Sequence, residues 1–199
     1  MIWGVVLAAG LSRRMGRAKL LLDWGGRPVI RRAVEQVWAE GVNDLVVVVG
    51  HQDAAIREAL SGLRVRFVEN PTPEAGQGSS IACGVSALPA EVEAALIALG
   101  DQPKLPPEVI PRMLKAFKET GKAVVAPVYR GVQGNPVLFA SPVFPELRAL
   151  TGDRGARMLV EKDPGRVAVV AFDLTVPPDL DTPEEYERLR PPGNPVLNL

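Results

Sequence analysis

The chain is poor in cysteine and histidine, and each scarcity removes a class of chemistry. Its 199 residues include one cysteine and one histidine. A single cysteine, Cys83, excludes an intrachain disulfide framework, so a reduced, cytoplasmic setting is expected. Cys83 lies among apolar residues of an expected helix, which favours a buried thiol over a nucleophile. His51 is more typical of a polar loop residue than of a general base, and no Ser-His-Asp or Cys-His-Asn grouping is evident.

The sequence also lacks an excess of charge and a long apolar run. Lys+Arg and Asp+Glu are 23 each, which gives a formal net charge of zero. A protein that binds nucleic acid without regard to sequence usually carries a basic excess. No apolar run approaches the roughly 20 residues that span a bilayer, and no signal-type segment opens the chain. Neither nucleic acid nor a membrane is therefore expected as a partner.

Two common nucleotide-binding fingerprints are absent as well. The chain has neither Gly-x4-Gly-Lys-Ser/Thr nor Gly-x-Gly-x-x-Gly after its first apolar run. Instead, the run 2–7 leads into a loop with two glycines, Gly10 and Gly16, followed by Lys19. Gly10 permits close approach of the backbone to phosphates, and Gly16 permits a positive φ. Such a loop offers N–H groups and positive charge to a triphosphate, although a plain strand-to-helix connection is the alternative.

Strand-like runs alternate with helix-like segments along the chain. Expected strands cover 2–7, 45–49, 65–68, 94–99, 123–128, 135–139 and 167–172. Expected helices cover 28–40, 54–60, 79–88, 107–119, 145–150 and 154–161, and a last helix opens at 181–185. This alternation predicts an α/β fold with a single doubly wound, mostly parallel sheet and helices on both faces. We expect one domain, 1–190, followed by a tail, 191–199.

Acidic residues follow a buried strand and precede the last helix. Asp101 comes directly after the run 94–99, where open α/β sheets collect functional groups. Asp179 and Asp181 share one side if their segment is extended. Mg²⁺ takes one or two carboxylates plus substrate phosphates, so Asp101 and one of these two aspartates are a candidate pair. A turn at Asp101 and a helix N-terminus at Asp181 are the structural alternatives.

Polar loops elsewhere suggest contacts with substrates. The stretch 70–80 contains Asn70, Gln77, Gly78 and Ser79, and we expect it to contact base and ribose while Ser79 caps the following helix. A cap alone is the simpler explanation. In the later motifs 134–139 and 152–157, Asn135, Arg154 and Arg157 are candidate contacts to a phosphorylated acceptor, and plain turns fit equally well.

Taken in order, these motifs resemble the nucleotidyltransferases of molybdenum cofactor biosynthesis. The motifs are Leu7-Ala8-Ala9-Gly10-Leu11-Ser12-Arg13-Arg14-Met15-Gly16 with Lys19, Gly100-Asp101-Gln102-Pro103, Gly134-Asn135-Pro136-Val137-Leu138-Phe139, Gly152-Asp153-Arg154-Gly155-Ala156-Arg157 and Asp181-Thr182-Pro183-Glu184. The first motif is shared by many nucleotidyltransferases with a nucleotide-diphospho-sugar-transferase-like fold. The set as a whole looks most like the molybdenum cofactor cytidylyltransferases, although many members carry histidine where this chain has Asn135.

The resemblance implies Mg²⁺-dependent transfer of CMP from CTP to the terminal phosphate of a molybdenum-loaded pterin. It implies catalytic roles for Arg14, Lys19 and Asp101, with the metal held by Asp101 and Asp181. The nucleotide would contact Leu7, Ala8, Ala9, Gly10, Ser12, Lys19, Asn70, Gln77, Gly78 and Ser79, and the acceptor Asn135, Arg154 and Arg157. A molybdoenzyme or its chaperone is a possible further partner. The alternatives are guanylyl or other nucleotidyl transfer to a different phosphorylated acceptor, and a non-catalytic nucleotide-binding or cofactor-delivery protein.

Overall fold

The computed structural model describes residues 1–10, 15–16, 18–50, 53–153 and 155–192. Its strands are β1 (Ile2–Leu7), β2 (Asp44–Val49), β3 (Arg66–Glu69), β4 (Ala94–Leu99), β5 (Val124–Tyr129), β6 (Val132–Gln133), β7 (Val137–Ala140) and β8 (Val167–Phe172). Its α-helices are α1 (Val29–Val37), α2 (Asp53–Ala59), α3 (Gln77–Ser86), α4 (Val109–Thr120), α5 (Phe144–Arg148), α6 (Arg157–Lys162) and α7 (Pro183–Leu189). Short 3₁₀ turns are η1 (Lys19–Leu21), η2 (Pro73–Ala75), η3 (Ser141–Val143) and η4 (Pro164–Arg166).

The strands form one sheet in the order β3-β2-β1-β4-β7-β5-β6, and β8 pairs with β5. Strands β1 to β4 are mutually parallel, and β8 is parallel to β5. β7 is antiparallel to both of its neighbours, β4 and β5. The mostly parallel, doubly wound sheet predicted from the alternation of strands and helices is therefore confirmed.

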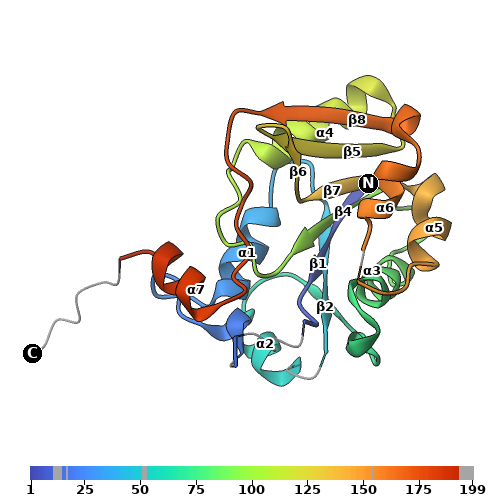
Figure 1. Cartoon of the computed structure of the whole chain (residues 1–199). Helices are drawn as coiled ribbons and strands as arrows, with labels where there is room; N and C mark the ends of the chain where they lie inside the picture. The colour runs from blue at the N-terminus through green and yellow to red at the C-terminus, as the bar shows by residue number, and fades with distance from the viewer. Residues whose placement is uncertain (11–14, 17, 51–52, 154, 193–199) are drawn as a thin grey trace, which may run out of the picture.

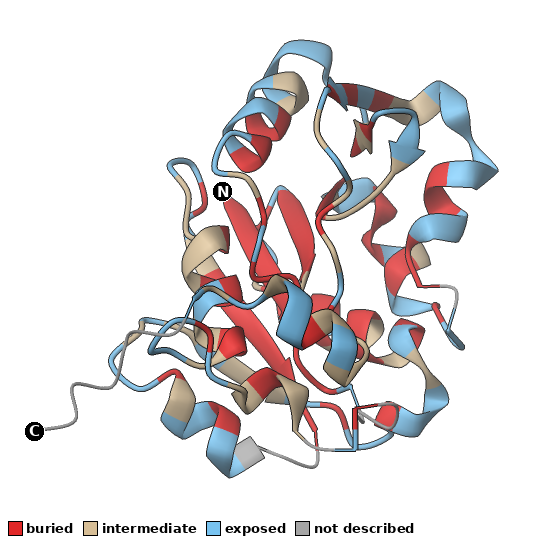
Figure 2. Cartoon of the chain, turned by 60° about the vertical axis from the view of Figure 1, so that its left-hand side comes forward, coloured by how far each residue is buried: buried red, intermediate tan, exposed pale blue. Residues whose placement is uncertain are grey.

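Helices cover both faces of this sheet. Around β1 and β2 in Figure 1, α1, α2 and α7 lie on one side and α3, α5 and α6 on the other. Within β2, Val47 belongs to the first core while Val46 and Val48 belong to the second. A strand buried on both faces needs apolar residues at every position, which explains the unbroken valine run. The central strands are accordingly buried along almost their whole length (Figure 2).

The order of the strands reverses beside β1. The chain passes from β1 outward to β2 and β3, then returns to β4 on the other side of β1. Leu7 and Leu99 lie opposite each other in the parallel register, and Gly100 N–H donates to the Leu7 carbonyl. The carboxyl ends of β1 and β4 therefore open side by side, which is where doubly wound sheets bind ligands.

Some local predictions differ from the structure. The antiparallel direction of β7 and the short strand β6 were not anticipated. The helix expected over 28–40 ends at Val37, and the one expected from Ser79 begins two residues earlier, at Gln77. The predicted domain limit, 190, falls just after α7 ends at Leu189, and residues 193–199 of the expected tail lie outside the described residues.

Candidate functional site

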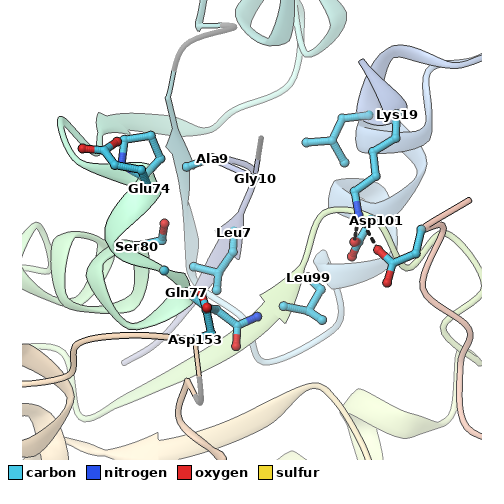
Figure 3. A pocket seen from close by; sticks show the side chains of 14 residues that line it. Leu7, Ala9, Gly10, Lys19, Glu74, Gln77, Ser80, Leu99, Asp101 and Asp153 are labelled. Atoms are coloured by element: carbon cyan, nitrogen blue, oxygen red, sulfur yellow. Dashed lines mark hydrogen bonds and ion pairs between the residues drawn. The ribbon is translucent and has the colours of Figure 1, made fainter. Parts of the chain in front are cut away.

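A cavity of ≈ 470 Å³ opens at the carboxyl ends of β1 and β4. Ligand pockets of a few hundred Å³ suit a nucleotide-sized molecule. Lys19 and Asp101 stand at one side, Glu74, Gln77 and Ser80 at the other, with Leu7 and Leu99 between them (Figure 3). The full lining comprises Leu7, Ala9, Gly10, Lys19, Leu20, Pro73, Glu74, Gly76, Gln77, Ser80, Leu99, Asp101, Asp153 and Asp181.

Lys19 joins two aspartates that are distant in the sequence. Its Nζ lies 2.5 Å from Asp101 Oδ2 and 2.9 Å from Asp181 Oδ1 (Figure 3). The side chains of Lys19, Asp101 and Asp181 are only 12%, 17% and 26% exposed. The structure thus brings together the lysine and both acidic residues that the sequence motifs singled out.

The surrounding carboxylates govern the protonation of Lys19. Burial acts to lower the pKa of Lys19, but the charge of Asp101 and the hydrogen bonds to Asp101 and Asp181 outweigh it, so the pKa is raised above 10.5. The ammonium is therefore fully charged at neutral pH. Burial, followed by the negative charge of Asp101, raises the pKa of Asp179 above its usual range.

Gln102 ties the two acidic segments together. It is 6% exposed, and its Nε2 donates to Asp179 Oδ1 at 2.7 Å and to the Pro177 carbonyl at 3.2 Å. The Leu180 N–H also donates to the Asp101 carbonyl. Asp179 is thereby turned toward Gln102, while Asp181 reaches Lys19. Of the two aspartates, Asp181 is therefore the one that is hydrogen-bonded to Lys19.

We expect Gln102→Leu to lower both stability and turnover. The change removes the amide donor from the carbonyl of the buried Pro177 and from the Asp179 carboxylate, at a cost of about 1–3 kcal/mol. It also loosens the segment that carries Asp181. Thermal unfolding and initial rates measure the two effects. Gln36→Leu is the matched control, because the Gln36 side chain only accepts from the Leu105 N–H. A Gln102→Leu protein with the wild-type midpoint and rate would contradict this positioning role.

The loop before α3 is held by its own polar groups. Asn70 is 3% exposed, and its Nδ2 donates to the Ser79 and Ser80 hydroxyls. The Ser79 hydroxyl donates to the carbonyls of Thr72 and Gly76. Ser79 lies in the first turn of α3, and Gly76 is the N-cap residue, so the predicted cap at Ser79 is wrong. Asn70 and Ser79 do not reach the cavity wall, whereas Ser80 does.

Glycine permits two loops to meet at the far side of the cavity. Gly78 N–H donates to the Gly152 carbonyl, and a Cβ at Gly78 would lie 2.8 Å from the Thr151 backbone nitrogen. The contact uses the Gly78 N–H and places Asp153 beside Gln77 in the lining. Gly78 therefore allows the two loops of this wall to pack closely, although Gly78 itself does not line the cavity.

A second pocket of ≈ 180 Å³ adjoins the first through Leu7, Gln77 and Leu99. Asn135 and Arg157, two residues predicted to contact an acceptor, line it together with Gln133. Arg157 is 70% exposed and pairs with Glu161 one turn along α6. Amide groups and a guanidinium thus border a pocket that shares three lining residues with the main cavity.

The remaining predicted residues fall into three groups. Leu7, Ala9, Gly10 and Gln77 line the cavity, and Gly16 has the expected positive φ, 66°. Ala8 is buried, and its N–H donates to the Val48 carbonyl beneath the cavity floor. Ser12, Arg14 and Arg154 lie outside the described residues.

Sequence reasoning missed Glu74, Ser80 and Asp153. Each lies within a stretch that was recognised, 70–80 or 152–157, but only the docking of the 151–153 loop against Gly78 shows that these side chains share one wall.

Two properties of the described part of the chain bear on ligands. Among those residues, no three His, Cys, Asp or Glu side chains gather as a metal site. None of the helices in the same ranges has the length and apolar character that a membrane span requires.

A family model matches most of the chain. The model of the MobA-like NTP transferase domain matches residues 4–167. This chain belongs to the MobA-like NTP transferase domain family. The matched segment contains most of β1 and all of β4, together with Lys19 and Asp101, while Asp181 lies beyond it.

Several relatives match nearly the whole chain. The purine catabolism protein PucB of Bacillus subtilis is 32% identical, covering 94% of this chain and 95% of that protein. Nicotine blue oxidoreductase of Paenarthrobacter nicotinovorans is 29% identical, covering 94% and 96%. A match to the bifunctional protein GlmU of Sorangium cellulosum, 37% identical, covers 61% of this chain but only 27% of that protein.

Solved structures give the same fold. Rv0371c from Mycobacterium tuberculosis has a TM-score of 0.84 at 30% identity, covering 94% of this chain and 96% of that chain. A structure of Rv0371c in complex with manganese has a TM-score of 0.82 at 28% identity, covering 95% and 97%. The fold is therefore that of a nucleotidyltransferase family of the MobA-like kind.

Proposed function

We propose that this MobA-like nucleotidyltransferase transfers CMP from CTP to the terminal phosphate of a molybdenum-loaded pterin. The observation that carries the proposal is the meeting of Lys19, Asp101 and Asp181 at the mouth of the β1/β4 crevice. In this proposal, an acceptor phosphate oxygen forms a bond to the α-phosphorus of CTP. The bond from that phosphorus to the bridging oxygen breaks, and pyrophosphate leaves.

The chain's own groups have distinct tasks in this reaction. Lys19 directs a charged ammonium at the triphosphate, with Gly10 allowing close approach and Ser12 and Arg14 as further expected contacts. A phosphate monoester has a second pKa of about 6, so the acceptor needs no protein base at neutral pH. Positioning and charge stabilisation then supply most of the acceleration.

A divalent cation fits the donor set beside Lys19. Asp101 and Asp181 already converge on one positive charge, and carboxylate oxygen is the ligand that Mg²⁺ prefers. Mg²⁺ held there would neutralise charge that develops on the phosphates. The manganese complex of the related Rv0371c supports a divalent ion for this family member.

The acceptor and the nucleotide base rest on different features. The adjoining pocket, bordered by Gln77, Gln133, Asn135 and Arg157, offers amide donors and acceptors to a heterocycle and a cation to its phosphate. Resemblance of Leu7-Ala8-Ala9-Gly10 to the cytidylyltransferase motif supports CTP. Transfer of GMP or another nucleotide to a different phosphorylated acceptor is the second candidate. It is kept because two relatives with other names, PucB and nicotine blue oxidoreductase, each match 94% of this chain.

A substrate panel tests the proposal. The whole chain is incubated with Mg²⁺, one of the four nucleoside triphosphates, and the molybdenum-loaded pterin, and pyrophosphate and the nucleotide conjugate are measured. We expect both products with CTP only, and neither when the acceptor is left out. Products with GTP alone would replace CMP transfer by GMP transfer to this acceptor. Failure of every triphosphate with this acceptor, in a protein that binds nucleotide, would reject the proposed reaction.

A further inference from the structure

The ammonium of Lys19 occupies the place between Asp101 and Asp181 that a metal ion is proposed to take. Nζ is within 2.9 Å of one oxygen from each carboxylate. The three side chains are mostly buried, so solvent screens their charges only weakly. One lysine leaves the trio with a net charge of −1, whereas the two aspartates alone would carry −2.

The ammonium and a divalent cation cannot share these oxygens. Mg²⁺ approaches carboxylate oxygen to about 2.0–2.1 Å, so it would lie only a few ångströms from Nζ in its present position. Repulsion between charges of +1 and +2 at that separation is large in a partly buried site. A metal that takes these two oxygens therefore requires Lys19 to move away from them.

We propose that Lys19 is a displaceable cation that keeps the metal seat closed until a nucleoside triphosphate arrives. This inference rests on the proposed function, which assigns the metal to Asp101 and Asp181. The incoming phosphates give the ammonium a new anionic partner, and its departure releases the two carboxylate oxygens that it holds, Asp101 Oδ2 and Asp181 Oδ1. Metal and nucleotide consequently bind with positive coupling, and free metal alone binds poorly.

The local structure allows the side chain to move without the backbone. Lys19 begins the η1 turn, and its neighbour Leu20 is 4% exposed within the first hydrophobic core. Lysine carries a point charge on a flexible four-carbon stem, so its donors adapt to a new acceptor without a fixed orientation. Gly10 and Lys19 line the same cavity, where the triphosphate is proposed to bind.

A purely structural ion pair predicts the opposite behaviour. If Lys19 served to hold Asp101 and Asp181 in place, its loss would let the carboxylates separate, and metal affinity would fall. If Lys19 competes with the metal, its loss raises the affinity for free metal while the nucleotide loses a partner. The sign of the change in metal affinity separates the two roles.

The test measures Mn²⁺ binding to the whole chain by electron paramagnetic resonance, without acceptor and without turnover. We expect Lys19→Met and Lys19→Gln to bind free Mn²⁺ at least about tenfold more tightly than the wild type. Lys104→Met, which removes an exposed lysine outside the cavity lining, should leave the affinity unchanged. The tighter binding should vanish when Asp101→Asn is added to Lys19→Met, which assigns the metal to this seat.

A second measurement tests the coupling. Mn²⁺ binding is measured again with a non-hydrolysable CTP analogue present, and the Mn²⁺ bound by the analogue itself is subtracted. The affinity of the wild-type protein for Mn²⁺ should then rise, and the rise should be much smaller in Lys19→Gln. Equal or weaker binding of free Mn²⁺ by both folded Lys19 variants would overturn the inference, whatever the substrate panel shows. Conversely, a failed substrate panel with tightened Mn²⁺ binding would reject the proposed reaction and leave the displaceable lysine standing.

Discussion

Replacing Asp101 with asparagine should reduce turnover by about 10²–10⁴-fold, the scale seen when a group that stabilises transition-state charge is removed. The amide keeps the size of the side chain but removes the negative charge opposite Asp181. The fold should survive, because the Asp101 contact to Leu180 uses its backbone carbonyl. Pyrophosphate release at saturating Mg²⁺ and nucleotide gives the rate, and thermal unfolding monitors the fold.

Asp173→Asn is the matched control for this change. The Asp173 side chain is 92% exposed and pairs with Arg130 away from the cavity, so its rate should stay within about twofold of the wild type. An Asp101→Asn protein with near-wild-type, metal-dependent turnover would count decisively against a metal role for this carboxylate.

Lys19→Met should lower turnover by about 10²-fold or more, because a charged contact to the reacting phosphates is lost. Methionine retains much of the unbranched stem, so the packing over Leu20 is largely preserved. Nucleotide affinity is measured by calorimetry in the absence of acceptor, and rates by pyrophosphate release. Both should fall.

Lys104→Met serves as the control here too. Lys104 is exposed, and its ammonium lies 5.9 Å from the centroid of the Trp24 ring, so removing it tests loss of a nearby cation outside the cavity. If Lys19→Met left nucleotide affinity and turnover both unchanged, the role of the loop lysine would be refuted.

Local pattern was enough for the central elements of the fold. The bounds of β1, β4 and β8 agree with the apolar runs from which they were predicted, and β2 differs by one residue, Asp44. β1, β2 and β4 are buried almost throughout, so their composition directly reflects their surroundings, whereas β8 alternates between buried and exposed residues. The antiparallel direction of β7 could not be predicted in this way. The apolar run that ends at Phe139 indicates burial, but it does not show in which direction the neighbouring strands, which are distant in the sequence, run.

In the candidate site, too, some residues could be recognised from local motifs and others could not. Lys19, Asp101 and Asp181 were recognisable because each stands in a distinctive motif beside a strand end or a helix start. The loop around Asn70 and Ser79 was harder, since a polar side chain in sequence does not show whether its hydrogen bonds serve a ligand or the loop itself. In the folded chain those bonds are internal.

By itself the sequence determined the alternation of strands and helices, the glycine loop after β1 and the acidic motifs, because these depend on residues close together in the chain. The tertiary structure alone decided that Asp181, and not Asp179, faces Lys19, that β7 runs against its neighbours, and that Ser80 and Asp153 share a wall. Those outcomes depend on which distant segments pack together, and the Lys19–Asp181 contact, spanning 162 positions, exists only once they have.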